Sequence, residues 1–260
     1  SYTTTYEALT GIQLKANTDS GKPIPTEMGG HIGYNGFVHT LTSRYCSADR
    51  YFGEHPEYFA LHLGHRSTNQ LCLSNPDVLK IVTEEVLDAI AEADAVILGP
   101  GSLYTSIMPN LCVHQVVDAI KESECKTFYV CNVTQQPGET TGYTAADHLQ
   151  AIYDHSCSEM IDYMIVDDGK TETKIPLADF LVQASERVVV DHERLDSFNT
   201  EIIETNVVCE DNPYRHDSMK LAQTIMKAIY NDKDYKLRYG LAKTWLDYRR
   251  FQKMKEGEEQ

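Results

Sequence analysis

Short apolar runs alternate with helical stretches over residues 76–230, and this alternation limits the architectures that the chain can adopt. Two strand-sized apolar runs, Ala95–Leu98 and Thr127–Cys131, are expected to form buried strands, the first covered on both faces. Expected helices over Asp77–Glu92 and Val113–Ile120 precede them. Strands that alternate with helices of this length are typical of a parallel sheet. The sequence therefore predicts an α/β fold with a mostly parallel sheet covered by helices on both faces.

The rest of this stretch continues the same order. We expect helices over Thr144–Tyr153 and Asp217–Tyr230, and strands over Met160–Val166, Glu186–Val190 and Thr205–Cys209. Thr and Asp, which begin the two helices, are common N-cap residues. We therefore expect a single domain over residues 1–260, with residues 76–230 as its core, a loop-rich part over 1–75, and a basic amphipathic helix over 235–260.

Composition narrows the cellular setting. Of the 260 residues, 42% are hydrophobic, which is enough to bury a core in one large domain or in two small ones. No apolar run approaches the roughly 20 residues of a membrane-spanning helix, so we expect no integral membrane contact. The first residues lack the basic and apolar regions of a secretory signal. The seven cysteines include no CxxC pair, which favours buried thiols in a reducing, intracellular compartment over a zinc site.

The net charge is strongly negative and unevenly distributed. The chain carries 23 Lys and Arg against 39 Asp and Glu, a formal net charge of −16. Residues 216–260 hold 10 basic and 7 acidic residues, which leaves −19 for residues 1–215. Such a field repels polyanions, so we expect no nucleic-acid partner. An anionic ligand would have to be held by local groups.

The most informative motif directly follows the run Ala95–Leu98. The chain enters a Gly-Pro-Gly turn at Gly99 and Gly101, and hydroxyl residues and an expected helix come next. An open α/β sheet presents backbone amides and a helix N-terminus to phosphate in this way, and glycines permit close approach. The other residues expected to contribute are the hydroxyl donors Ser102, Thr105 and Ser106, and Tyr104, whose ring could stack on or hydrogen-bond a ligand ring.

Other interpretations of this motif differ in strength. The loop has no Lys at the P-loop position, and its glycine spacing is not that of the dinucleotide fingerprint GxGxxG, so both of those sites are excluded. A simple Gly-Pro turn followed by an ordinary helix cap stays open as an alternative to a phosphate loop.

Two further motifs carry candidate ligand contacts. Asn132 follows the run Thr127–Cys131 and offers both a donor and an acceptor at the strand end where α/β sheets bind ligands. A polar loop that only leads into the helix at Thr144 is the alternative. Arg215 precedes the last expected helix, and its planar guanidinium suits a diphosphate or a carboxylate. A salt bridge within the protein is the alternative there.

The same motifs resemble a known family. The resemblance to the bacterial gluconeogenesis factor family is carried by GPGSLYTSIMPNL (Gly99–Leu111), YVCNVTQQPGETTGYTAADH (Tyr129–His148) and YRHDSMKLAQTI (Tyr214–Ile225). That family belongs to the superfamily of the 2-phospho-L-lactate transferase of deazaflavin cofactor synthesis. The three motifs occur in the family's order, and the similarity covers about Asn75–Ile229.

The resemblance implies a Rossmann-like α/β fold and a cytoplasmic regulatory protein. Its ligand would be a nucleotide sugar of the UDP-N-acetylglucosamine kind, and its role would lie in carbon metabolism, cell shape and envelope synthesis. A protein partner or a homo-oligomer would transmit the signal. Residue by residue, the phosphate loop would also include Asn110, while Asn132 and Arg215 would contact the ligand. His65 and Asn69 fit the family's Gly-His-x-x-x-Asn segment. Asp19 lies in the segment Thr18–Gly21, which resembles the family's Asp-Asp-Gly-Gly-Ser-type segment.

Two alternatives belong to other classes of protein. The chain could be a phosphoryl or nucleotidyl transferase like its remote relatives, with Mg²⁺ held by carboxylates. Asp19 and Asp147 are the carboxylates that the motifs offer for this role. The chain could instead be a scaffold that acts through the basic aromatic segment 235–260, which either packs on the body or a second subunit or lies on a membrane surface.

Overall fold

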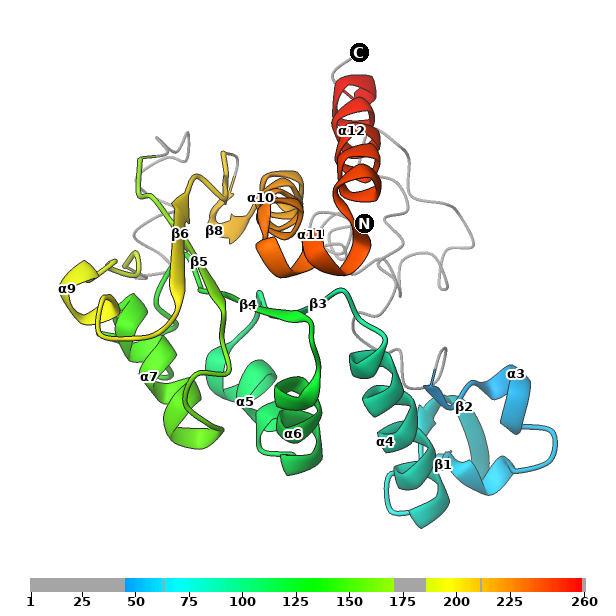
Figure 1. Ribbon diagram of the computed structural model, residues 1–260. Coiled ribbons are helices and arrows are strands. Elements are labelled where there is room, and N and C mark those ends of the chain that lie inside the picture. The colour runs from blue at the N-terminus through cyan, green and yellow to red at the C-terminus, as the bar shows by residue number, and fades with distance from the viewer. Residues whose placement is uncertain (1–44, 63, 171–185, 211, 259–260) are drawn as a thin grey trace. The chain divides into compact units, whose positions relative to one another are not determined.

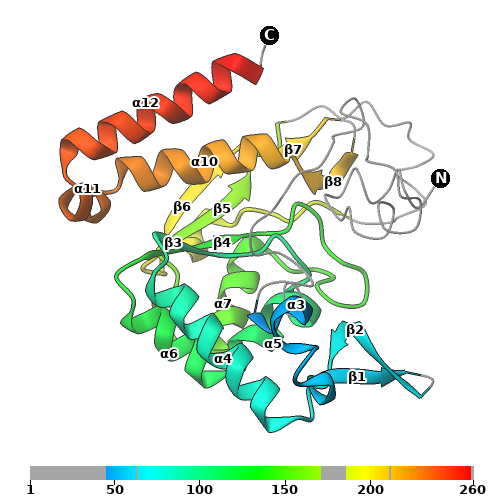
Figure 2. The same ribbon diagram turned by 90° about the vertical axis from the view of Figure 1, so that its right-hand side faces the viewer.

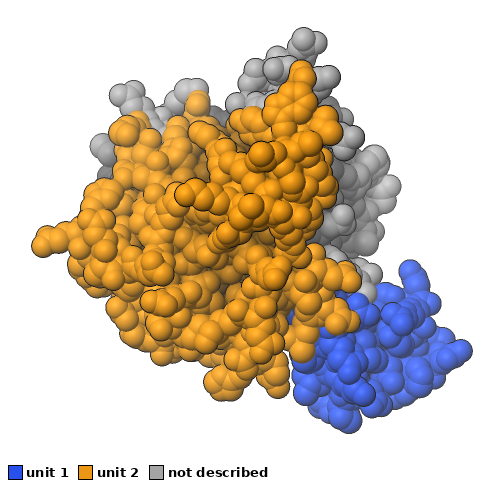
Figure 3. Space-filling model, in the orientation of Figure 1, with its two compact units in different colours: residues 1–86 blue, residues 87–260 orange. Residues whose placement is uncertain are grey.

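The computed structural model describes residues 45–62, 64–170, 186–210 and 212–258, with helices and strands that fall into two compact units. Figure 3 colours the units, residues 1–86 and 87–260. Asp19 lies outside the described residues. The expectation of a single domain over residues 1–260 stays a prediction, and each unit is described by itself.

Unit 1 contains an antiparallel strand pair with short helical segments. Its elements are α3 (Ala48–Tyr51), the 3-10 turn η3 (Pro56–Tyr58), β1 (Phe59–His62), β2 (His65–Leu71) and most of α4 (Pro76–Ala91). Five buried side chains form its core, namely Cys46, Tyr58, Phe59, Leu71 and Val78. Unit 1 therefore has a small apolar core of its own.

Unit 2 is built on a four-stranded parallel sheet in the order β3-β4-β5-β6. The strands are β3 (Ala95–Leu98), β4 (Lys126–Val130), β5 (Tyr163–Asp167) and β6 (Glu201–Thr205). All three strand pairs are parallel, with Leu98 opposite Tyr129 and Val130 opposite Ile165. This confirms the predicted α/β fold and its mostly parallel sheet.

Helices cover both faces of this sheet, as Figures 1 and 2 show. One face carries η4 (Leu103–Ile107), α5 (Met108–Leu111), α6 (His114–Glu122), α7 (Ala145–His155) and α9 (His192–Leu195). The other face carries α10 (Ser218–Asn231), and α11 (Lys233–Tyr239) and α12 (Leu241–Glu258) follow it in the chain. The short pair β7 (Val208–Cys209) and β8 (Asn212–His216) is antiparallel and leads into α10.

The alternation of side chains along β4 explains why both faces need helices. Tyr129 belongs to the core on the α7 side, whereas Phe128 and Val130 belong to the core on the α10 side. All three are fully buried. Successive residues of a strand point to opposite faces, so a continuous apolar strand requires cover on both.

Three expected elements differ from the structure. Ala95–Leu98 is only partly buried, because β3 is an edge strand of the described sheet and Ile97 is 37% exposed. Glu186–Val190 forms a single bridge, between Arg187 and Thr134, instead of a strand. The expected strand Thr205–Cys209 is divided between the end of β6 and β7.

The segment expected as one helix over 235–260 lies in two helices. α11 ends at Tyr239 and α12 begins at Leu241, and Gly240 between them has a φ of 79°, which favours glycine. Within the described part of the chain, no helix combines the length and apolar character needed to cross a membrane.

Replacing Met164 with alanine tests the buried sheet. Met164 lies on β5 with its side chain fully buried, so we expect Met164→Ala to lower the free energy of unfolding by about 2–5 kcal/mol through lost burial and a cavity. Met219→Ala is the matched control, because Met219 on α10 is 45% exposed and should cost under about 0.5 kcal/mol. Urea unfolding followed by circular dichroism measures both, and equal losses would contradict this description of the core.

Candidate functional site

The carboxyl ends of the parallel strands bring the candidate residues to one edge of the sheet. β3 ends at Leu98, β4 at Val130 and β5 at Asp167, and their registers are parallel. The loop that begins at Gly99 and the segment that begins at Asn132 therefore leave neighbouring strands at the same edge. Ligands of open α/β sheets bind at this edge.

A sharp turn at Gly99 starts the predicted phosphate loop. Gly99 has a φ of 93°, and a Cβ placed there would lie 3.1 Å from the carbonyl oxygen of Val130 on the adjacent strand. Gly101 is also tightly placed, since its Cβ would lie 3.3 Å from Cβ of Ser106. Both predicted glycines thus have a steric reason, which an ordinary surface turn would not require.

Ser102 organises the next turn through its backbone and its side chain. Its carbonyl accepts hydrogen bonds from the amides of Ser106 and Ile107, both at 3.0 Å, and these bonds close the π-helical turn η4. Its Oγ accepts a longer bond from the Thr105 amide at 3.4 Å. Leu103 and Ile107 anchor the turn in the core, while Thr105 and Ser106 are exposed. The loop is therefore anchored in the core by its apolar side chains, while the side chains of Thr105 and Ser106 are exposed to solvent.

Glu139 supplies a carboxylate to this loop. Its Oε1 accepts a hydrogen bond from Ser102 Oγ at 2.5 Å and another from the Tyr104 amide at 2.6 Å. Ser102 Oγ also lies 2.5 Å from Thr105 Oγ1. Donors of the predicted phosphate loop thus converge on one anionic oxygen, which is what a phosphate oxygen would require.

Tyr104 lies in an aromatic group beside the loop. Its hydroxyl is 2.8 Å from that of Tyr143, and the two rings are nearly perpendicular with centroids 6.3 Å apart. The hydrogen bond with Tyr143, together with burial, raises the pKa of Tyr104 to about 12. Tyr104 is therefore a neutral hydroxyl at pH 7, and its hydroxyl already has a partner.

Asn132 lies at the carboxyl end of β4 in a tightly bonded segment. Its Nδ2 donates to Gln136 Oε1 at 3.0 Å, and the Gln136 amide donates to Thr140 Oγ1 at 2.9 Å. Thr140 is fully buried and holds the segment to the body of unit 2. Thr144 caps α7 through a reciprocal capping box with Asp147, as the sequence predicts for that helix start.

Arg215 lies on β8, whose last residue is tied to the same strand end. His216 Nε2 donates to the carbonyl of Cys131, immediately after β4, at 3.0 Å. Arg215 is half-buried and has interactions within the structure. Asp217 is the N-cap of α10, as predicted. Its Oδ1 accepts hydrogen bonds from the amides of Met219 and Lys220 at 2.9 and 3.0 Å.

The remaining predicted residues lie on α5, on β2 or outside the described residues. Asn110 is exposed on α5 and donates its Nδ2 to the carbonyl of Ser106 at 2.7 Å, a contact that stabilises the turn from its far end. His65 and Asn69 are exposed on β2 and belong to unit 1. Asp19 lies outside the described residues.

The structure adds residues that sequence analysis missed. Glu139 is one, and an ion pair between Asp167 and Arg187 is another, with 2.8 Å between Oδ2 and Nη1. Asp167 ends β5, and its Oδ1 also accepts from the Val207 amide at 3.4 Å. An acidic residue at the end of an apolar strand was the available signal for Asp167. No local signal pointed to Glu139, whose partners lie 35 and 37 residues away.

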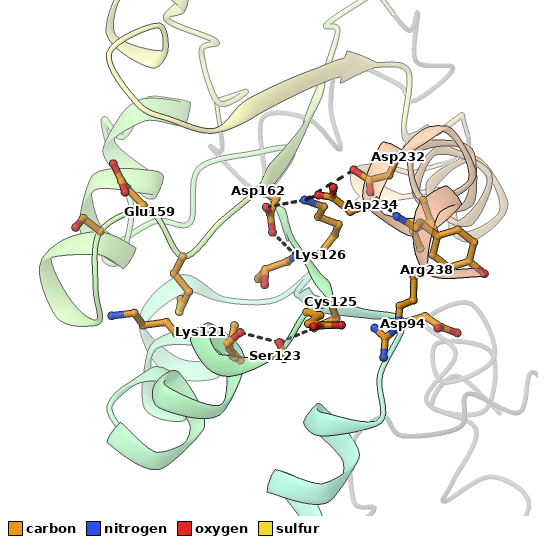
Figure 4. A pocket seen from close by; sticks show the side chains of 17 residues that line it. Asp94, Lys121, Ser123, Cys125, Lys126, Glu159, Asp162, Asp232, Asp234 and Arg238 are labelled. Carbon is orange, nitrogen blue, oxygen red and sulfur yellow. Dashed lines mark hydrogen bonds and ion pairs between the residues drawn. The ribbon is translucent and has the colours of Figure 1, made fainter. Parts of the chain in front are cut away.

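A cavity of about 710 Å³ lies at the opposite, amino edge of the sheet (Figure 4). Lys126, the first residue of β4, is 2.7 Å from Asp234 and 3.6 Å from Asp162. The hydrogen bond to Asp234 raises the pKa of the Lys126 ammonium. Six acidic residues line the cavity against three basic ones, namely Asp94, Glu124, Glu159, Asp162, Asp232 and Asp234 against Lys121, Lys126 and Arg238. This edge suits an anion poorly.

Fold and site together define an α/β protein with a loop of glycine and hydroxyl residues at the carboxyl edge of a parallel sheet. A family model described as "2-phospho-L-lactate transferase CofD" matches residues 59–208. The chain belongs to this family, which confirms the superfamily that the three motifs suggested.

Individual relatives agree with this assignment. A protein named "Gluconeogenesis factor" from Halalkalibacterium halodurans is 41% identical over 144 residues, which cover 55% of this chain and 44% of that protein. One with the same name from Bacillus subtilis is 38% identical over 146 residues, with 56% and 46% coverage. The chain thus spans less than half the length of these two relatives.

A solved structure supports the fold. The X-ray crystal structure of a Bacillus halodurans protein superimposes with a TM-score of 0.51 at 40% sequence identity, over 55% of this chain and 46% of that one.

A comparison of two glycines tests the close approach at Gly99. We expect Gly99→Ala to lower the free energy of unfolding by about 1–3 kcal/mol, because alanine is strained at a positive φ. The close contact of its Cβ with the Val130 oxygen should add a further loss. Gly138→Ala is the control, because Gly138 has a φ of 79° but no atom within 4 Å of its Cβ position. Denaturant unfolding of both variants checks this. A loss for Gly99→Ala no larger than that for Gly138→Ala would show that the contact is unimportant.

The buried His148 and the partly buried His216 predict sensitivity of the fold to mild acid. Burial lowers the pKa of His148 and of His216 below the ordinary value of 6.5. As pH falls below 6.5, the unfolded chain takes up protons that the folded protein does not, so the free energy of unfolding falls. We expect a smaller decrease between pH 7.5 and pH 5.5 for the double variant His148→Gln, His216→Gln than for the unmodified chain. Equal decreases in denaturant unfolding would contradict this.

Proposed function

We propose that this chain binds a nucleotide sugar of the UDP-N-acetylglucosamine kind at the carboxyl edge of its sheet and acts as a cytoplasmic regulatory protein. One observation carries the proposal. The Ser102 hydroxyl and the Tyr104 amide both donate to a single anionic oxygen, that of Glu139, at 2.5 and 2.6 Å. The loop therefore already binds a carboxylate in the manner expected for a phosphate oxygen.

Three of the predicted groups have a part in this proposal, namely the loop after β3, Arg215 and Asn132. The loop from Gly99 to Ser106 binds the diphosphate through amides and hydroxyls, which carry no net charge. Arg215 supplies the positive charge, and it lies one residue from His216, which is bonded to the end of β4. Asn132 at that strand end orients the base or the sugar through its amide group.

The relatives support the regulatory part of the proposal. Two of them carry the name "Gluconeogenesis factor", which describes a role in metabolism and no reaction. We extend to this chain a role in carbon metabolism, cell shape and envelope synthesis, exerted through a protein partner or a second copy of the chain. The nucleotide sugar would bias those contacts.

The family description favours one alternative, a phosphoryl or nucleotidyl transferase. Such a reaction would use Mg²⁺ held by carboxylates. Asp147 does not fit this role, because its carboxylate closes the capping box of α7 and pairs with Arg194 at 2.8 Å. Among the described residues, no group of three or more His, Cys, Asp or Glu side chains is arranged to hold a metal ion.

Calorimetric titration with UDP-N-acetylglucosamine tests the proposed function. We expect the unmodified chain to bind, and Arg215→Ala to weaken binding about tenfold or more, because a charge-assisted contact to the diphosphate is lost. Arg238→Ala is the matched control, since Arg238 lines the cavity at the amino edge. An absence of heat at millimolar ligand, or equal affinities for Arg215→Ala and Arg238→Ala, would overturn the proposal.

A further inference from the structure

Glu139 occupies the donors that a ligand phosphate would need. Its Oε1 takes the hydrogen bonds of both Ser102 Oγ and the Tyr104 amide, two groups on the same turn of the loop. The two bonds are 2.5 and 2.6 Å long. The short turn η4 alone would identify no site, and it is the seated carboxylate that shows which atoms bind an anion.

A phosphate and the Glu139 carboxylate cannot occupy these donors together. Both carry negative charge, and two like charges a few ångströms apart in a partly buried place repel strongly. The Tyr104 amide has one hydrogen to donate, so each new acceptor must take the place of the old one. Binding of a diphosphate to this loop therefore requires the carboxylate to leave.

The local structure allows the carboxylate to leave without unfolding the segment. Glu139 lies between two glycines with positive φ, Gly138 and Gly142, and the adjacent Thr140 is fully buried. The Thr140 amide donates to the carbonyl of Gln136 at 2.9 Å, so the backbone beside Glu139 is held in place. Glu139 itself is only half-buried. A rotation of its side chain is enough to vacate the loop.

We propose that Glu139 is an internal competitor, whose carboxylate binds the loop in the free protein and is displaced when the diphosphate of a nucleotide sugar binds. This inference rests on the proposed function and adds its regulation. The apparent affinity is the intrinsic affinity multiplied by the fraction of molecules in which the loop is vacant. A partner that draws Glu139 away from the loop would raise the affinity for the ligand, and the ligand would in turn favour that partner.

Removing the charge at position 139 tests this inference. Glu139→Gln keeps the shape of the side chain and one accepting oxygen. We expect this variant to bind UDP-N-acetylglucosamine about ten- to a hundredfold more tightly than the unmodified chain, because no carboxylate competes for the loop. Glu124→Gln is the control, because Glu124 is exposed and lines the cavity at the amino edge. It removes the same charge and should leave the affinity unchanged. Circular dichroism confirms folding, and Glu139→Ala serves if the Gln variant does not fold.

A second readout needs no ligand. Hydrogen exchange of the Tyr104 amide, measured by NMR, should be slow in the unmodified chain and faster in Glu139→Ala, because the amide loses its acceptor. Equal exchange rates of the Tyr104 amide in the two proteins would show that Glu139 does not accept its hydrogen bond, and would contradict the inference.

The possible outcomes separate the two proposals. Equal binding of the ligand by the unmodified chain and Glu139→Gln would overturn the competition and leave the proposed function standing. Binding by both proteins, with Glu139→Gln tighter by about tenfold or more, would support both proposals. If neither protein binds, the proposed function is wrong and the inference falls with it.

Discussion

Parallel pairing of β3, β4 and β5 is the constraint on which the rest of unit 2 depends. Because each strand starts at the same edge, every loop that follows a strand leaves at the opposite one. The glycine turn after β3, Asn132 after β4 and Asp167 at the end of β5 are thereby brought to one edge. Burial on both faces of β4 holds this arrangement, with Tyr129 on one side and Phe128 on the other.

The proposed anionic ligand requires local hydrogen-bond donors, because the net charge of the chain, −16, repels anions. The loop after β3 supplies amide and hydroxyl donors, and its turn is fixed by the buried Leu103 and Ile107. The same donors already hold Glu139, so an internal carboxylate balances them in the free protein. The amino edge of the sheet has no such donors to offer from Lys126, because its ammonium group forms ion pairs with Asp234 and Asp162. The two edges of one sheet therefore differ in the charge of ligand that they suit.

Local patterns predicted the elements whose determinants are local. The apolar run that became β4, the Thr144 cap of α7 and the Asp217 cap of α10 lie within a few residues of their signals. The glycine turn was also visible, because the strand, the glycines and the hydroxyl residues are consecutive.

Determinants that are distant in sequence were not predictable. Glu139 reaches Ser102 only because the loops after β3 and β4 leave at the same edge, and nothing near Glu139 signals this. Glu186–Val190 has the composition of a strand, but its described backbone contacts reach the loop residues 133–135 and 145, so it forms a single bridge. Its neighbours in space, which the sequence does not show, decided its structure.

A crystal structure of the chain with UDP-N-acetylglucosamine would test the central claim most directly, since that claim concerns which edge of the sheet binds the ligand. The account predicts that the diphosphate lies against the Ser102 hydroxyl and the Tyr104 amide, with Arg215 in contact and the Glu139 carboxylate turned away. A diphosphate bound beside Lys126 at the amino edge, or one that leaves Glu139 seated on the loop, would contradict it.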